Sequence, residues 1–256
     1  MTPLMFFFPY SGASGMTFQN WAKLFAPVID CRVMEYPGRG ERIEEDFYPD
    51  VQTAASDLYQ TVKSDVLGND PGKSPSPYYL CGHCLGALIV YELYFLIRDR
   101  SEFPLPEAVL LSGQGAPDQP QDGGMSSMED RKLLEYIYSQ GRLDREMLDP
   151  QMMRFVRELI LEPLKSDSAL CVHYQSEHAA VRDKIEVPLH LFFGSDDDIY
   201  GQSLVRRWTE FSDGVDFTGF KGTHYFLLDS AQEYVAQAKG RLLQAGNGSE
   251  QAAGSE

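Results

Sequence analysis

The sequence predicts an α/β fold in which a mainly parallel sheet is covered by helices on both faces. Short apolar runs alternate with longer segments whose apolar residues recur at helical spacing, and this alternation is typical of strand–helix–strand units. The 256 residues suit one large domain, or one domain with an insertion. Apolar residues make up 43% of the chain, which is enough for a sizeable core.

Strands are expected where apolar residues run together, and helices where they recur every third or fourth position. The predicted strands are residues 4–8, 28–36, 77–81, 107–112, 187–194 and 215–220. The predicted helices of the same unit are residues 18–25, 51–66, 85–97, 202–211 and 232–243. Residues 1–113 and 186–244 are therefore predicted to form the sheet and its covering helices.

The alternation stops in residues 114–185, which are predicted to be a helical insertion. This stretch opens with a loop rich in Gly, Pro and Asp and then carries three helical patterns, at 128–140, 151–161 and 164–174. An insertion of this kind between two strands of a parallel sheet is interpreted as a lid that gates access to a site. An ordinary helical excursion without a gating role is the alternative.

Charge and composition exclude several classes of function. The formal net charge of −16 argues against binding nucleic acid or anionic lipid through a broad basic surface. No apolar run is long enough to span a membrane, and the first residues lack the basic region of a signal peptide. Four cysteines are too few for a disulfide scaffold, so a cytoplasmic protein is expected. Residues 245–256 lack periodicity and large apolar side chains, which predicts a disordered tail.

The segment from Tyr79 to Ala87, with the sequence YLCGHCLGA, is the most informative part of the chain. Cys81 and Cys84 have the C-x-x-C spacing of dithiol oxidoreductases. The same residues also form G-x-C-x-G, a nucleophile elbow with cysteine where serine is usual. An elbow needs a strand, a tight turn with small residues on each side, and a helix, and all three are expected here. Gly86 is required by the elbow and has no part in a redox site, so the elbow is favoured.

A nucleophile at Cys84 needs a base and an acid that orients the base. Of the five histidines only His224 follows the last predicted strand, where a loop can reach over the strand ends. The acid is expected in the loop after residues 187–194, which contains Asp196, Asp197 and Asp198, and spacing alone does not choose among them. Two backbone N–H groups should form an oxyanion hole. One is expected from Leu85, and the other from the loop of small residues at 9–15.

Five blocks in order and spacing resemble the type II thioesterases, stand-alone α/β-hydrolases that accompany nonribosomal peptide and polyketide synthases. The blocks are FPYSGAS at 8–14, YPGRGER at 36–42, GHCLGA at 82–87, GSDD at 194–197 and GTHYF at 222–226. The resemblance implies an α/β-hydrolase fold and a triad of Cys84, Asp197 and His224. It places the oxyanion donors at the N–H groups of Ser11 and Leu85.

The resemblance also implies the substrate, which in that family is an acyl group held as a thioester on the phosphopantetheine arm of a carrier protein. The protein is expected to have no cofactor and no metal of its own. Its expected partner is an acyl or peptidyl carrier protein, and the protein itself is expected to be a monomer. The basic residues Arg39, Arg42, Arg206, Arg207 and Lys221 are interpreted as scattered solvated side chains, with a small docking patch as the alternative. Hydrolysis through an acyl-S-Cys84 intermediate is the expected reaction.

Cys84 departs from the family pattern, and this leaves a second reaction open. A cysteine nucleophile forms another thioester, which is nearly isoenergetic with the substrate and can still acylate a thiol or an amine. Acyl or aminoacyl transfer between carrier domains, or onto an amine, is therefore the alternative to hydrolysis. A dithiol oxidoreductase built on Cys81 and Cys84 is a third reading.

Overall fold

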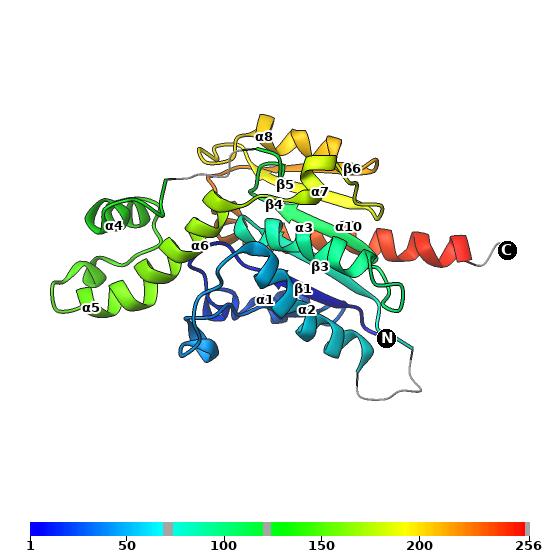
Figure 1. The fold of residues 1–256 in the computed structure, drawn as a ribbon, viewed down its shortest axis with the longest axis horizontal. Helices are drawn as coiled ribbons and strands as arrows, with labels where there is room; N and C mark the ends of the chain where they lie inside the picture. Colours follow the sequence, from blue (N-terminus) through cyan, green and yellow to red (C-terminus); the bar gives the residue numbers. More distant parts are fainter. Residues whose placement is uncertain (69–73, 120–123, 254–256) are drawn as a thin grey trace.

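The computed structural model describes residues 1–68, 74–119 and 124–253. At its centre is a six-stranded sheet with the order β2-β1-β3-β4-β5-β6, in which every neighbouring pair is parallel (Figure 1). The strands are β1 (Leu4–Phe8), β2 (Asp30–Val33), β3 (Tyr78–His83), β4 (Ala108–Ser112), β5 (Leu189–Gly194) and β6 (Val215–Phe220). All six predicted strands are present, and the predicted α/β fold is confirmed.

Helices follow the strands and cover both faces of the sheet. The α-helices are α1 (Trp21–Phe25), α2 (Val51–Leu67), α3 (Leu85–Arg98), α4 (Asp130–Ser139), α5 (Met153–Val156), α6 (Glu162–His173), α7 (Glu177–Val181), α8 (Gln202–Arg206), α9 (Phe226–Asp229) and α10 (Ala231–Ala253). Short 3-10 segments are η1 (Gly15–Phe18), η2 (Gly40–Arg42), η3 (Arg145–Leu148) and η5 (Arg207–Glu210), and η4 (Arg157–Leu161) is a π-helix.

The central strand β1 shows how the sheet separates two cores. Successive side chains of a strand point to opposite faces. Phe6 and Phe8 therefore join a cluster built on α2 and α3, whereas Met5 and Phe7 join another built on α1 and α10. All five residues of β1 are buried, as expected for a strand covered on both faces.

Helix α2 illustrates why the helices form where the sequence predicts them. The side chain of Asp50 accepts a hydrogen bond from the N–H of Thr53 at 2.6 Å and caps the first turn. Gly68 ends the helix with φ 63°, a conformation that suits glycine. Between these ends, seven residues at helical spacing are buried against the sheet: Val51, Ala54, Ala55, Leu58, Tyr59, Val62 and Val66.

The segment between β4 and β5 carries α4 to α7. In Figure 1, α4 and α5 stand away from the sheet, beyond the strand ends and on the opposite side of the molecule from the last turns of α10. Their apolar residues form a separate cluster that includes Leu133, Leu134, Val156 and Leu161. The third helix of this segment, α6, reaches back to α3 and joins the insertion to the sheet.

Two expectations for this part of the chain and one for the terminus are wrong in detail. Residues 151–161 and 164–174 were expected to form separate helices, but α5, η4 and α6 form one continuous helical run. Pro163 lacks an N–H group and so removes one α-helical hydrogen bond, and the π-helix lies directly before it. The insertion also ends with α7, a short helix that the periodicity did not indicate.

The tail was expected to be disordered from residue 245, but helix α10 continues to Ala253. Tyr234, Val235 and Leu242 pack the first half of α10 against the sheet. Once this half is fixed, each further residue adds a hydrogen bond without a new nucleation cost. Residues 254–256 lie outside the described residues.

Candidate active site

Cys84 lies in the turn between β3 and α3, at the centre of the sheet. There β1 and β3 are neighbours, while the chain leads from β1 to β2 on the other side. Ligand sites of α/β sheets form at such switch points, outside the carboxyl ends of the strands. The backbone of Cys84 has φ 54° and ψ −121°, a strained conformation for a residue other than glycine. Such strain is typical of a nucleophile elbow.

Two glycines make this tight turn possible. A Cβ atom on Gly82 would lie 2.3 Å from the backbone oxygen of Gly86. A Cβ atom on Gly86 would lie 1.9 Å from the backbone oxygen of Phe8. Both positions therefore exclude any side chain, and the close contact with Phe8 brings the elbow against the loop that follows β1.

The two cysteines of the C-x-x-C spacing belong to different cores. Cys84 packs with the cluster on the α2 and α3 face, and Cys81 packs with the cluster on the α1 and α10 face. Both are buried free thiols. Because the sheet lies between these clusters, the arrangement favours the elbow and not a dithiol site.

His224 and Asp197 form a buried pair next to the elbow. The Nδ1 atom of His224 lies 3.0 Å from Oδ2 of Asp197, and the side chains are 2% and 0% exposed. Oδ1 of Asp197 accepts hydrogen bonds from the N–H groups of Ile199 and Tyr200, both at 2.9 Å. The neighbouring Asp196 and Asp198 are exposed, so burial distinguishes Asp197 among the three aspartates.

The electrostatics of His224 favour its protonated form when Cys84 is a thiolate. Burial alone opposes protonation, but the charge of Cys84 and hydrogen bonds with Asp197 and Cys84 outweigh it. Together they raise the pKa of His224 to about 10. This is the charge distribution of a thiolate–imidazolium pair, in which one ring nitrogen faces the carboxylate and the other serves the sulfur.

His83 is a member of the site that the sequence analysis left without a role. Its Nε2 atom donates to the carbonyl oxygen of His224 at 3.1 Å, and its Nδ1 atom accepts from the hydroxyl of Ser112 at 2.8 Å. Burial and the nearby His224 charge hold the pKa of His83 well below its usual range, so the ring is neutral. A neutral ring with one donor and one acceptor matches these partners, and His83 thereby ties β3 to the backbone of the His224 loop.

The residues predicted to supply the oxyanion donors both lie next to Cys84. Ser11 belongs to the loop after β1, is 5% exposed and lines the same cavity as Cys84. Leu85 is the first residue of α3, where N–H groups have no partner within the helix. Two backbone N–H groups at such a position suit the developing oxyanion of a tetrahedral intermediate.

The cavity at Cys84 is small and is covered by the insertion. Its volume is about 10 Å³, close to the minimum that one water molecule needs. Besides Ser11 and Cys84, its walls are Met125, Ser168, Cys171, Ile199 and Tyr200. Three of these belong to the insertion between β4 and β5. An acyl chain therefore requires these side chains to move.

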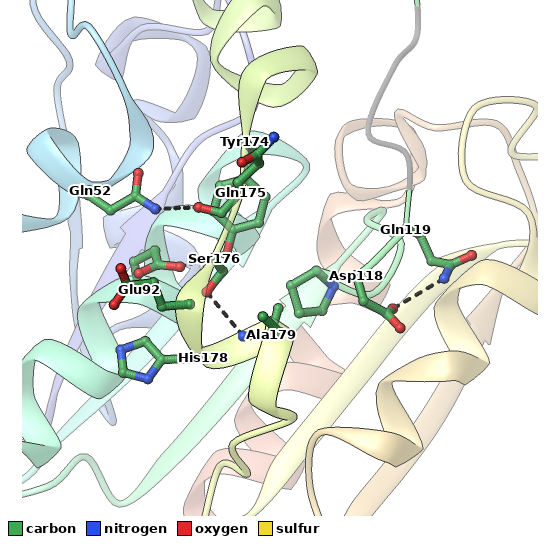
Figure 2. A pocket seen from close by; sticks show the side chains of 12 residues that line it. Gln52, Glu92, Asp118, Gln119, Tyr174, Gln175, Ser176, His178 and Ala179 are labelled. Carbon is green, nitrogen blue, oxygen red and sulfur yellow. Dashed lines mark hydrogen bonds between the residues drawn. The ribbon is translucent and has the colours of Figure 1, made fainter.

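A much larger cavity lies away from this cluster. It has a volume of about 1030 Å³ and is formed by α2, α3, α7 and the segment after β4 (Figure 2). In it, Tyr174 donates a hydrogen bond to Glu92 at 2.8 Å, and Gln52 donates to the backbone oxygen of Gln175 at 2.8 Å. Neither Cys84, His224 nor Asp197 lines it.

Arg39 corrects the expectation that the basic residues of this region are solvated. Its side chain is 4% exposed and makes a bidentate ion pair with Asp167 of α6. This contact joins residues that are 128 positions apart, so no local pattern in the sequence indicates it. Arg207 is also paired, with Asp118 at 2.7 Å.

Within residues 1–68, 74–119 and 124–253, no group of three or more His, Cys, Asp or Glu side chains is placed to hold a metal ion. Over the same ranges no helix combines the length and apolar character that crossing a membrane requires.

The parallel sheet, the strained turn at Cys84 and the order of Cys84, Asp197 and His224 along the chain define an α/β-hydrolase fold. The family model of the thioesterase domain matches residues 3–242. The chain belongs to this family and is a hydrolase that acts on thioesters.

Relatives and solved structures agree with this assignment. The gramicidin S biosynthesis protein GrsT of Aneurinibacillus migulanus is 25% identical over 236 residues, covering 90% of this chain and 85% of GrsT. The thioesterase PikA5 of Streptomyces venezuelae is 24% identical, covering 92% of this chain and 79% of PikA5. The structure of RedJ, a thioesterase of the prodiginine pathway of Streptomyces coelicolor, is 26% identical with a TM-score of 0.79, covering 94% of this chain and 85% of RedJ.

Proposed function

We propose that the protein is a type II thioesterase that hydrolyses acyl or aminoacyl thioesters on the phosphopantetheine arm of carrier proteins. The names of its relatives support a biosynthetic role, since GrsT is a gramicidin S biosynthesis protein and RedJ is a thioesterase of the prodiginine biosynthetic pathway. The observation that carries the proposal is the arrangement of Cys84, His224 and Asp197 in a thioesterase-family fold. The protein would act as a cytoplasmic monomer without a cofactor or metal of its own.

In the first half of the reaction the thiolate of Cys84 attacks the thioester carbonyl. The carbonyl oxygen becomes an oxyanion that the N–H groups of Ser11 and Leu85 stabilise. When the tetrahedral intermediate collapses, the bond to the pantetheine sulfur breaks and His224 gives its proton to that sulfur. The products are the free thiol of the carrier and an acyl group on Cys84.

In the second half, water releases the acyl group. Neutral His224 takes a proton from a water molecule, and the hydroxide attacks the acyl-Cys84 carbonyl. The carbon–sulfur bond breaks, the free acid leaves, and the thiolate of Cys84 returns beside protonated His224. Asp197 holds the His224 ring in the required orientation.

The test is intact-protein mass spectrometry of the enzyme mixed with a panel of acyl- and aminoacyl-loaded carrier proteins. The proposal expects a transient adduct on Cys84 and free acid as the product, whether or not a second, empty carrier is present. Cys84→Ala should show neither adduct nor turnover, while its circular dichroism remains that of the wild type. Full turnover by Cys84→Ala would refute the proposed nucleophile, and Cys81→Ala is the matched control that should keep activity.

Acyl transfer to a second carrier is the alternative, and the identity of the nucleophile favours it. Residue 84 is a cysteine, so the acyl intermediate remains a reactive thioester. A long-lived adduct that moves to the empty carrier with little free acid would establish transfer in place of hydrolysis.

A further inference from the structure

The buried pair of Arg39 and Asp167 holds the loop that follows β1. Nη1 and Nη2 of Arg39 lie 2.5 Å and 2.8 Å from the two carboxylate oxygens of Asp167. Both side chains are 4% exposed. Asp167 belongs to α6 of the insertion, whereas Arg39 follows β2, so the pair joins the insertion to the sheet domain.

The same two side chains also bind the backbone of the loop. Oδ2 of Asp167 accepts a hydrogen bond from the N–H of Gly12 at 2.8 Å. Nη1 of Arg39 donates to the carbonyl oxygen of Ala13 at 3.3 Å. Consecutive residues of the loop are therefore held by opposite ends of one ion pair.

The loop packs directly on α6 at this point. Gly12 has φ 78°, and a Cβ atom there would lie 2.9 Å from the Cβ of Leu164. Only glycine fits such a contact without displacing the helix. Gly12 immediately follows Ser11, the proposed oxyanion donor, so the position of Gly12 sets the position of Ser11.

We propose that Arg39 and Asp167 are positioning residues for the oxyanion hole. They fix the loop on α6 so that the N–H of Ser11 faces the carbonyl attacked by Cys84. This inference rests on the proposed thioesterase mechanism and adds to it two residues that touch neither substrate nor nucleophile. It also makes helix α6, whose Ser168 and Cys171 line the cavity at Cys84, part of the machinery that shapes the hole.

The test separates the loop contact from the buried charge. Removing Asp167 alone would leave the Arg39 charge buried and unpaired, which can prevent folding. The informative variants are two double substitutions, Arg39→Met with Asp167→Leu and Arg39→Met with Asp167→Asn. Neither contains the ion pair, and only asparagine keeps an acceptor for the N–H of Gly12. Lys165→Met is the matched control, because Lys165 lies on the same helix as Asp167 but pairs with Asp130 of α4.

Steady-state hydrolysis of a loaded carrier is the first readout. The leucine double variant should lose roughly 10²-fold in kcat, the scale of one displaced oxyanion donor, with KM changed by less than about threefold. The asparagine double variant should recover the part of that loss that belongs to the Gly12 contact, and the rest belongs to the contact of Arg39 with Ala13. Lys165→Met should match the wild type. Equal kcat values for the two double variants would overturn the inference.

Hydrogen exchange of the peptide that spans residues 9–15 is the second readout, and it needs no substrate. The leucine variant should exchange faster than the asparagine variant, because the N–H of Gly12 has lost its acceptor. Identical exchange in both would overturn the positioning role even if hydrolysis is established. Absence of hydrolysis by the wild type on every loaded carrier would instead refute the proposed function, while the exchange result would still decide whether the pair holds the loop.

Discussion

Replacing His224 with glutamine tests the thiolate–imidazolium pair. The pKa of His224 rises from 6.5 to about 10 in the folded protein. At 1.36 kcal/mol for each pH unit, this corresponds to about 5 kcal/mol in favour of the charged ring. Cys84 is the first of the causes that raise the pKa, and Asp197 supplies much of the rest. Without the imidazole, the sulfur of Cys84 loses the base next to it, a contribution of about 10²–10⁴-fold in rate.

His224→Gln should therefore reduce alkylation of Cys84 at neutral pH by roughly 10²-fold, the lower end of that range. The assay follows the rate of iodoacetamide labelling by intact mass, and peptide mapping identifies the labelled residue. The other cysteines are poor competitors, because burial raises the pKa of Cys31 to about 12 and those of Cys81 and Cys171 well above the usual range. A rate within threefold of the wild type, in a variant with an unchanged circular dichroism spectrum, would refute the pairing of His224 with Cys84.

Three further predictions follow from the same contacts. The pKa of His224 is higher in the folded protein than in the unfolded chain, so protonation of His224 stabilises the fold fully below about pH 6.5. The difference in Tm between the wild type and His224→Gln should therefore shrink as the pH rises to about 10. Gly86→Ala should fail to fold, because the new Cβ atom would lie 1.9 Å from the backbone oxygen of Phe8. Gly240 is exposed in α10 and has open space around it, so Gly240→Ala should raise the free energy of unfolding in urea titrations by about 0.5–1 kcal/mol. Asp197→Asn should lower kcat by roughly 10²-fold or more, and Asp198→Asn should leave kcat within about twofold; equal effects would contradict the assignment of the acid.

The sheet and the elbow were predictable because their signals are local. The run of apolar residues in β1 indicates a strand that is buried on both faces, and the glycines around Cys84 indicate a tight turn. The choice of Asp197 over its neighbours was not available from spacing alone. It depends on the N–H groups of Ile199 and Tyr200, which turn back onto that carboxylate only in the folded loop.

The contacts that the sequence did not reveal join distant parts of the chain. Arg39 and Asp167 are 128 positions apart, and His83 and the carbonyl of His224 are 141 apart. A single buried charge leaves no periodic pattern in the sequence, so Arg39 is interpreted as a surface residue when its partner Asp167 is not known. The π-helix before Pro163 was missed for a related reason, because apolar periodicity does not distinguish one helix with an irregular turn from two helices.

The proposed mechanism requires His224 to change its charge between the two half-reactions. The raised pKa of His224 suits the first of them, in which the protonated ring donates to the leaving sulfur. Once the departing thiol has taken that proton, the histidine is neutral beside the acyl group. A neutral imidazole is the form that can activate water, and the cavity at Cys84 has room for about one water molecule.

Cys84→Ser tests how much of the reaction depends on the thioester character of the intermediate. Serine would form an oxygen ester, which is more stable than the thioester and cannot easily return the acyl group to a thiol. The adduct observed by intact mass should therefore persist longer than on the wild type, and transfer to an empty carrier should fall below detection while slow hydrolysis continues. Transfer at the wild-type rate from Cys84→Ser would show that the acyl group reaches the second carrier without a thioester on residue 84.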